Sequence, residues 1–355
     1  MPDYDVIVVG GGPAGTVSAL KCSRSNLNVL LIERGELGRN KPCGGILPKV
    51  CTSLISESLE MDIPEDLMRS PPTLGLYYVP PSGRKNSGNM KDYKLISVSR
   101  NLLDRWLHQL AAESGVKILY ETEFLELRGA DPTQIVMRQG GKTFTATANY
   151  VIGADGVYSR VRSQLYGRTT FNVEPIIQEH WKAKGDFEES FYIFFRDDVS
   201  TASAYVIPKD DEYVIGVGSP QPNSMPLTTC LARFKKWLSE EFAFQPLSLS
   251  KREVWAIPYG LVFEGIGNTI LVGDAAGFCN TLSGEGIRFA VESGITSHDA
   301  ILDAISDKRP LAAVYGEYVE ELTSFVHTIH EFTTSLTDET KEEFVRSELD
   351  RISFN

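Results

Sequence analysis

VIVVGGGPAG, residues 6–15, joins a run of apolar, mostly β-branched residues to a glycine-rich turn. A helix-compatible stretch continues to about Ser25, so the order is strand, tight turn and helix. In a dinucleotide-binding turn, the first glycine permits the turn, the second lets a pyrophosphate approach the backbone, and the third lets helix pack on strand. The N-terminus of the helix offers free N–H groups to the phosphates. The predicted cofactor contacts of this motif are Gly10, Gly12, Pro13, Ala14 and Gly15.

A second apolar run, residues 29–32, ends in Glu33, which is followed by Arg34. An acidic residue at the end of the second strand is placed to hold a ribose hydroxyl, and it disfavours a 2′-phosphate. A glycine-rich turn also occurs in unrelated α/β proteins, so the hexapeptide alone is a weak signal. With strand, helix and acidic residue in place, the sequence predicts a Rossmann-like domain in which Glu33 and Arg34 contact a dinucleotide.

The composition of the chain argues against several classes of protein. Its 355 residues are 42% hydrophobic and 23% charged, which is typical of a globular protein large enough for two domains. A net charge of −12 argues against nucleic-acid binding, which requires a basic patch. The five cysteines lack a CxxC pairing, so neither a disulfide framework nor a metal site is expected. Because signal-peptide and membrane-spanning patterns are absent, we expect a cytoplasmic protein.

Two further apolar strands end in a glycine beside an aspartate. Residues 150–152 lead into the segment that carries Asp155, and residues 268–272 lead into the segment that carries Asp274. Together with the first motif, in this order, they resemble the three fingerprints of the flavoprotein hydroxylase and reductase superfamily typified by p-hydroxybenzoate hydroxylase. The resemblance implies FAD. Asp274 would then hydrogen-bond its ribityl and pyrophosphate groups, and Asp155 would lie in a strand end that contacts both FAD and a nicotinamide donor. The predicted contacts are Asp155, Gly273 and Asp274.

Arg100 begins a predicted helix over residues 100–115. It matches an arginine that reaches the FAD phosphates in this superfamily. A solvated arginine in the first turn of the helix is the alternative interpretation, and the sequence leaves both open.

A loop at residues 283–286 precedes another predicted helix and would aim backbone N–H groups at whatever lies in front of it. In the superfamily these donors face the N1 and C2 carbonyl edge of the flavin, where the reduced ring carries negative charge. Thr281 stands where relatives usually have proline, which leaves the rigidity of the loop open. The predicted contacts are Gly284, Gly286 and Ile287.

The string KPCGG, residues 41–45, resembles the geranylgeranyl reductase family, whose members carry it after the second strand. In that family the segment passes along the flavin ring, and Gly44 and Gly45, which lack a Cβ, would let the backbone approach a flat ring closely. The resemblance places Cys43 beside the flavin, where it could donate a proton or shape the substrate site. The alternative is a small buried hydrophobe that fills a gap.

Three strand-like runs, residues 191–195, 202–208 and 213–218, predict an antiparallel meander that roofs the flavin. Family reductases carry Y-x-W-x-F-P on the middle strand. Here only the proline is retained, and a tyrosine and an isoleucine replace the tryptophan and phenylalanine. Two tryptophans elsewhere are further cavity candidates, although aromatic residues on sheets are more often plain core. The predicted substrate contacts are Tyr205, Ile207, Trp181 and Trp255.

Residues 311–332 repeat apolar side chains at helical spacing and are expected to dock onto the FAD domain, with a lid or a lipid-surface contact as the alternative. The predicted class is α/β, a Rossmann-like FAD domain of the glutathione reductase and p-hydroxybenzoate hydroxylase type, interleaved with an antiparallel substrate domain. The predicted segments are 1–72, 100–170 and 263–310 for the FAD domain, 73–99 and 171–262 for the substrate domain, and 311–355 for C-terminal helices.

The resemblance implies a FAD-dependent reductase that passes a hydride to a C=C bond of a small hydrophobic substrate, such as an isoprenoid. The alternative is a single-component monooxygenase that acts through a C4a-hydroperoxide. A flavin protein that senses or carries without catalysis is a third hypothesis. Since the chain has no second GxGxxG, NAD(P)H or another reductant would dock transiently. Substrate identity, oligomeric state and the catalytic acid stay open.

Overall fold

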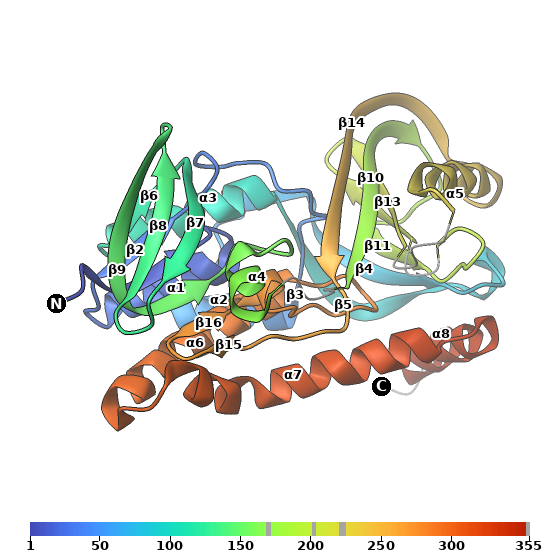
Figure 1. Ribbon diagram of the computed structural model, residues 1–355. Coiled ribbons are helices and arrows are strands. Elements are labelled where there is room, and N and C mark those ends of the chain that lie inside the picture. The colour runs from blue at the N-terminus through green and yellow to red at the C-terminus, as the bar shows by residue number, and fades with distance from the viewer. Residues whose placement is uncertain (168–171, 201–203, 220–224, 353–355) are drawn as a thin grey trace.

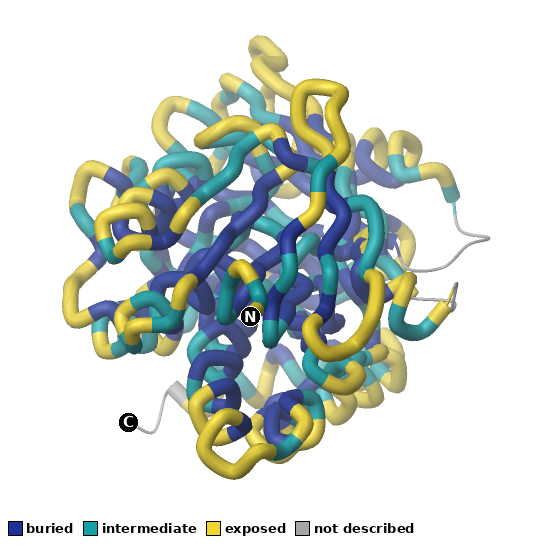
Figure 2. Tube along the Cα trace, turned by 60° about the vertical axis from the view of Figure 1, so that its left-hand side comes forward, coloured by how far each residue is buried: buried dark blue, intermediate teal, exposed yellow. Residues whose placement is uncertain are grey.

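The computed structural model describes residues 1–167, 172–200, 204–219 and 225–352. Within these ranges the chain forms two eight-stranded sheets, here called sheet A and sheet B, which lie side by side in Figure 1. Helices cover both, so the predicted α/β class is confirmed. Figure 2 shows long buried stretches through the interior and exposed residues mainly in the connecting loops.

Sheet A contains the predicted Rossmann-like core. Its central strands pair in parallel, β1 with β2 and β9, β2 with β6, and β9 with β16, and parallel neighbours require crossover connections rather than hairpins. Its strands are β1 (Tyr4–Val9), β2 (Val29–Ile32), β6 (Lys117–Leu119), β7 (Thr122–Arg128), β8 (Thr133–Gln139), β9 (Lys142–Gly153), β15 (Gly265–Ile266) and β16 (Thr269–Leu271). The order β15-β16-β9-β1-β2-β6 places β1 in the middle, and β7 and β8 extend from β9 as an antiparallel hairpin. The apolar runs of β1 and β2 are buried, as expected for parallel strands covered on both faces.

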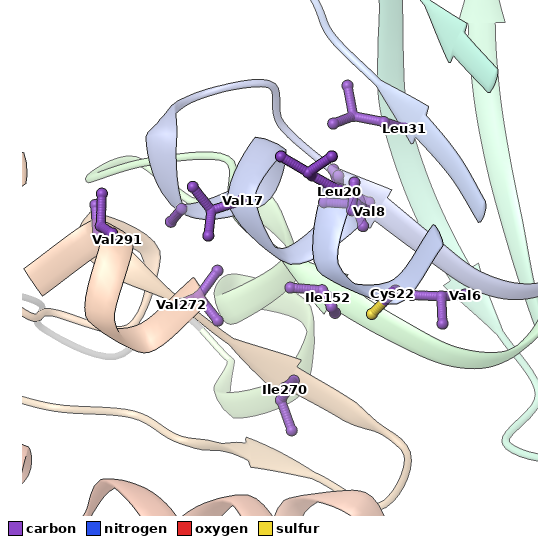
Figure 3. Close-up of a cluster of buried hydrophobic side chains, with 14 of the residues drawn as sticks. Val6, Val8, Val17, Leu20, Cys22, Leu31, Ile152, Ile270, Val272 and Val291 are labelled. Carbon is purple, nitrogen blue, oxygen red and sulfur yellow. The ribbon is translucent and has the colours of Figure 1, made fainter. Parts of the chain in front are cut away.

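Three helices pack together against sheet A: α1 (Pro13–Arg24), α3 (Arg100–Glu113) and α6 (Ile287–Asp307). Their apolar side chains interlock with those of the strands, as Val17 and Leu20 of α1 do with Val8 in Figure 3. A short helix, α2 (Lys49–Leu59), packs on α6, and α4 (Arg160–Tyr166) follows β9. This core fixes the ends of β1, β2 and β16, from which the functional loops project.

Sheet B has the order β14-β10-β13-β12-β11-β4-β5-β3, and its neighbours are antiparallel except β11 and β4. Its strands are β3 (Ile46–Pro48), β4 (Met68–Val79), β5 (Gly88–Val98), β10 (Val173–Lys184), β11 (Ser190–Phe194), β12 (Ala204–Lys209), β13 (Glu212–Gly218) and β14 (Gln245–Pro258). The predicted meander is confirmed as β11, β12 and β13. Residues 202 and 203 of the predicted middle run lie outside the described residues. The face of sheet B away from sheet A packs against α5 (Leu227–Glu241) through a cluster of aromatic side chains.

The C-terminal segment forms α7 (Leu311–Ser335) and α8 (Asp338–Ile352), which run along the bottom of the molecule in Figure 1. α7 docks on α6 and β16, as predicted for residues 311–332. α8 packs on β5, and Phe344 contacts Tyr78 of β4 and Phe195, which follows β11. Segments of the two sheets thus alternate along the chain, and their assignment to two functional domains stays a prediction.

Candidate functional site

A cavity of about 430 Å³ lies between the carboxyl ends of β1 and β2 and one face of sheet B. Its walls also include the loop at residues 41–45, the loop before α6 and the inward-facing side chains of β10, β12 and β14. Open α/β sheets bind their ligands at this carboxyl edge. The cavity therefore brings together motifs that are far apart in the sequence.

The glycine-rich turn after β1 forms one end of the cavity. A Cβ on Gly10, whose φ is +110°, would lie 2.3 Å from the carbonyl oxygen of Ala154. A Cβ on Gly15 would lie 2.0 Å from the carbonyl oxygen of Gly10, so both glycines let backbone pack on backbone. Gly12 differs, because a Cβ there would point into open space with no atom within 4 Å. The cradle thus fits a pyrophosphate over Gly12. The residues of this motif that line the cavity are Gly10, Gly12, Pro13 and Ala14, while Gly15 lies behind the turn.

Glu33 lies at the end of β2, 3% exposed, and lines the cavity. Its carboxylate accepts hydrogen bonds from the backbone N–H groups of Gly11 (2.8 Å) and Gly35 (2.7 Å) and pairs with Arg39 (3.0 Å). Burial alone would raise the pKa of Glu33, but Arg39 and the two N–H groups lower it below its usual value. His108 of α3 was not predicted from the sequence. Its Nε2 lies 2.6 Å from the carbonyl oxygen of Gly11, and this hydrogen bond stabilises the turn.

Arg100 begins α3 and is 9% exposed, so the interpretation as a solvated arginine is wrong. Its guanidinium donates to both carboxylate oxygens of Asp104, at 2.6 and 3.3 Å. Burial alone would lower the pKa of Arg100, but the charge of Asp104 raises it, so the group stays cationic. Arg100 lines the cavity together with Arg34 and Lys41. A buried permanent cation beside the glycine-rich cradle fits an anionic cofactor.

The two predicted aspartates both line the cavity. Asp274 lies in a 3₁₀ turn, η3 (Gly273–Ala275), and pairs with Lys41 at 2.8 Å. Asp155 accepts hydrogen bonds from the Ser159 hydroxyl (2.5 Å) and from the first backbone N–H of α4 (2.7 Å). Burial raises the pKa of Asp155 although these hydrogen bonds oppose it. Gly273 does not line the cavity and packs behind Asp274, against α1.

The loop before α6 also reaches the cavity. The Oδ1 of Asn280 accepts hydrogen bonds from the backbone N–H groups of Leu282 (3.0 Å) and Ser283 (3.3 Å). The Thr281 hydroxyl lies 3.4 Å from that of Thr333 on α7. The loop is therefore held by side chains in place of the proline that relatives usually carry. Its predicted contacts Gly284, Gly286 and Ile287 line the cavity.

The KPCGG loop lies against both sheets. Cys43 is partly buried and lines the cavity, and its Sγ accepts a hydrogen bond from the N–H of Gly45 (3.3 Å). A Cβ on Gly44 would lie 2.7 Å from the Cδ1 of Ile207, so the loop touches sheet B. The sequence missed Lys209, which donates to the carbonyl oxygens of Gly44 and Val98. Burial lowers the pKa of Lys209 to about 8.

The substrate contacts predicted on sheet B divide into two groups. Tyr205, Ile207 and Trp255 line the cavity, whereas Trp181 does not. Trp181 follows the opposite parity along β10, so it points away from the cavity. There its Nε1 donates to Glu179 (2.7 Å), and Lys235 of α5 lies over its ring. The expectation that Trp181 contacts substrate is therefore corrected.

Comparison with known proteins places this geometry in a family. The chain matches the FAD binding domain family over residues 3–296. It is 30% identical to a geranylgeranyl diphosphate reductase of Rhodobacter capsulatus over 321 residues, which cover 86% of this chain and 77% of the relative. The chain belongs to the geranylgeranyl reductase family of FAD-dependent oxidoreductases. The FAD binding domain and the reductase relative make this chain a FAD-dependent oxidoreductase, so the hypothesis of a non-catalytic flavin carrier is wrong.

Solved structures share the fold of this geranylgeranyl reductase family member. A geranylgeranyl bacteriochlorophyll reductase-like protein of Thermoplasma acidophilum aligns with a TM-score of 0.81 at 21% identity, covering 96% of this chain and 90% of that protein. The p-nitrophenol 4-monooxygenase PnpA of Pseudomonas putida aligns with a TM-score of 0.75 at 16% identity, covering 98% and 93%. Among the described residues, no helix is long and apolar enough to cross a membrane, and no side-chain cluster is arranged to hold a metal ion.

Proposed function

We propose that the protein is a reductase that saturates a C=C bond in a hydrophobic, isoprenoid-type substrate, with NAD(P)H or another reductant as the electron donor. The observation that carries this proposal is the apolar wall that continues the cofactor cavity onto sheet B. Its side chains are Leu76, Tyr78, Leu95, Phe191, Ile193 and Ile207. A hydrocarbon chain gains free energy by leaving water for such a wall. The name of the Rhodobacter capsulatus relative supports the same substrate class.

The cofactor motifs have separate roles in this proposal. The cradle over Gly12 and the N-terminus of α1 would hold the FAD pyrophosphate, with Arg100 as the counter-charge. Glu33 would hold the adenosine ribose, and the loop before α6 would present N–H groups to the flavin. Reduced FAD, when bound, supplies a hydride. The KPCGG loop, which Lys209 ties to the end of β5 by donating to the carbonyl oxygens of Gly44 and Val98, would keep water away from the reacting carbons.

Oxygen insertion is the alternative outcome. The monooxygenase structure that shares this fold is 16% identical, so it supports the architecture and not the reaction. Reduction is favoured by the KPCGG loop, which resembles that of geranylgeranyl reductases, and by the reductase relative at 30% identity.

The test is anaerobic mixing of the photoreduced protein with unsaturated isoprenoid diphosphates, unsaturated quinone-like lipids and their saturated counterparts. We expect flavin reoxidation only with unsaturated lipids, and a product that has gained two hydrogen atoms. Reoxidation that requires oxygen, with an oxygen atom from labelled dioxygen in the product, would establish a monooxygenase instead. Saturated lipids serve as the control for binding without chemistry.

A further inference from the structure

One buried acid of the cavity has a carboxyl oxygen without a hydrogen-bond partner among the described residues. Glu174 lies on β10 with the same parity as Ile176 and Gln178, and all three line the cavity. Glu174 is 2% exposed, and within the described residues its Oε2 has no hydrogen-bond partner. A Cβ on Gly218 of the adjacent strand would lie 1.9 Å from its Oε1, so this glycine leaves room for the carboxyl group.

The other acids of the same cavity, Glu285 apart, differ from Glu174, because cations or hydrogen-bond donors hold their carboxylates. Burial raises the pKa of Asp155 too, but its carboxylate accepts hydrogen bonds from the Ser159 hydroxyl and from two backbone N–H groups of α4. Glu33 pairs with Arg39, and Asp274 pairs with Lys41. Glu253 pairs with Lys251 and also accepts hydrogen bonds from Asn40 and Gln178. Its pKa falls to about 2, since these partners outweigh its burial.

Glu285 is the one rival, because its Oε1 also lacks a hydrogen-bond partner among the described residues. Burial raises the pKa of Glu285 as well, but the residue is only partly buried and the charge of Arg288 opposes the shift.

The surroundings of Glu174 keep it protonated. The titratable groups on which its charge acts are Tyr205 of β12, Tyr259 after β14 and Cys279 after η3, and all three are neutral near pH 7. Because the described residues place no cation or hydrogen-bond donor at its Oε2, an ionised carboxylate would lose its hydration with no compensation. Burial raises the pKa of Glu174 to about 8. At neutral pH the cavity therefore contains a carboxylic acid.

We propose that Glu174 is the catalytic acid, which gives its proton to the alkene carbon next to the one that receives the hydride. This inference rests on the proposed function. The hydride and its electron pair come from the reduced cofactor, so the alkene is reduced by two electrons and the cofactor is oxidised. The O–H bond of Glu174 breaks, a C–H bond forms, and the electron pair stays on the carboxylate. After the saturated product leaves, solvent returns the proton to the Glu174 carboxylate.

From the sequence, the thiol of Cys43 was the candidate proton donor. Its Sγ accepts a hydrogen bond from the backbone N–H of Gly45, which fixes the shape of the loop. The structure thus assigns Cys43 a positioning role and Glu174 the proton.

The first test uses Glu174→Gln and Glu174→Asp, with Glu212→Gln as the matched control. Glu212 lies on β13, pairs with His180 and does not line the cavity. We expect Glu174→Gln to slow anaerobic flavin reoxidation by an unsaturated lipid about 100-fold, the usual contribution of a general acid. The aspartate variant should retain part of the rate, and FAD affinity should stay at the wild-type value in all three.

The second test is an infrared difference spectrum of the oxidised, FAD-loaded protein without substrate, recorded at about pH 6 and about pH 10, on either side of the expected titration. The C=O band of a protonated carboxyl should disappear at the higher pH, be absent in Glu174→Gln and persist in Glu212→Gln. Wild-type protein that reduces no alkene would end both the proposed function and this inference. If wild type reduces the lipid and Glu174→Gln matches it, or if Glu285→Gln loses the rate and the band instead, the inference alone is overturned.

Discussion

The buried pair between Arg100 and Asp104 allows a quantitative test of the cofactor site. Their side chains are 9% and 5% exposed, and two hydrogen bonds join them. Asp104→Asn removes the counter-charge and leaves a buried guanidinium without compensation. Breaking a buried pair in this way costs about 3–5 kcal/mol. Because the asparagine amide oxygen can still accept one hydrogen bond, we expect a loss of about 3 kcal/mol in the free energy of unfolding.

Urea unfolding of the apoprotein and of the FAD-saturated protein measures this loss. The control is Glu240→Gln, which removes the acid of an exposed pair with Lys236 at the same helical spacing, and it should cost less than about 0.5 kcal/mol. If Arg100 meets the FAD phosphates, as we propose, the cofactor supplies the missing negative charge. FAD should then stabilise Asp104→Asn more than it stabilises wild type.

Two results would refute this reasoning at different points. If the free energy of unfolding of the Asp104→Asn apoprotein is within about 1 kcal/mol of wild type, the variant does not leave a buried Arg100 guanidinium without compensation. If the variant is destabilised but FAD stabilises both proteins equally, the guanidinium does not contact the cofactor phosphates.

Three further predictions concern the walls of the cavity. The pKa of Glu174 is raised to about 8, so the protonated group stabilises the fold below pH ~4.5, and this contribution is lost between there and pH ~8. Over this range the free energy of unfolding of wild type, measured by urea unfolding at several pH values, should fall by up to about 5 kcal/mol relative to Glu174→Gln. Gly45→Ala should lower the free energy of unfolding by more than about 1 kcal/mol and weaken FAD binding in a fluorescence titration, because φ of Gly45 is +66° and a Cβ would lie 2.2 Å from the carbonyl oxygen of Val98. A variant with the stability and the FAD affinity of wild type would contradict the loop geometry. Trp181→Phe should destabilise the protein by about 1–2 kcal/mol and leave KM unchanged, since the indole N–H and ring of Trp181 bind Glu179 and Lys235. Trp255→Phe should change KM with little loss of stability, because Trp255 lines the cavity, and the reverse pattern would mean that the two tryptophans have been assigned to the wrong faces of sheet B.

Local sequence patterns were sufficient to predict the FAD-binding half of the fold. The apolar runs at residues 6–9 and 29–32 are buried on both faces, so they read as parallel strands before any pairing is known. The glycines between strand and helix fix a turn whose geometry is set within ten residues. For the same reason, the strands that lead to Asp155 and Asp274 could be predicted to end at the ligand edge.

The face of each sheet B residue could not be predicted, because neighbouring residues point to opposite sides and the register depends on distant partners. Trp181 shows the consequence, since a shift of one position along β10 separates it from the cavity. Glu174 was missed for a related reason. An acid near the start of β10, beside apolar residues, is a visible signal, but Glu174 is unusual only because the described residues place no cation around it, and that depends on β12, β13 and β14.

The charges of the cavity are sorted by location, and this constrains how a substrate can lie in it. The cations Arg34, Arg39 and Lys41 gather near the cofactor motifs, where Glu33 pairs with Arg39 and Asp274 with Lys41, whereas the charged lining residues of β10 and β14 are the acids Glu174 and Glu253. An anionic head group, such as a diphosphate, would be repelled by an ionised acid on sheet B and attracted towards the loop of residues 34–41. The hydrocarbon would then extend along β4, β5 and β11, where α8 backs the far wall. In that orientation the protonated state of Glu174 has two effects. It provides the proton, and it leaves Glu253 as the one negative charge that the anionic head group meets on β10 and β14.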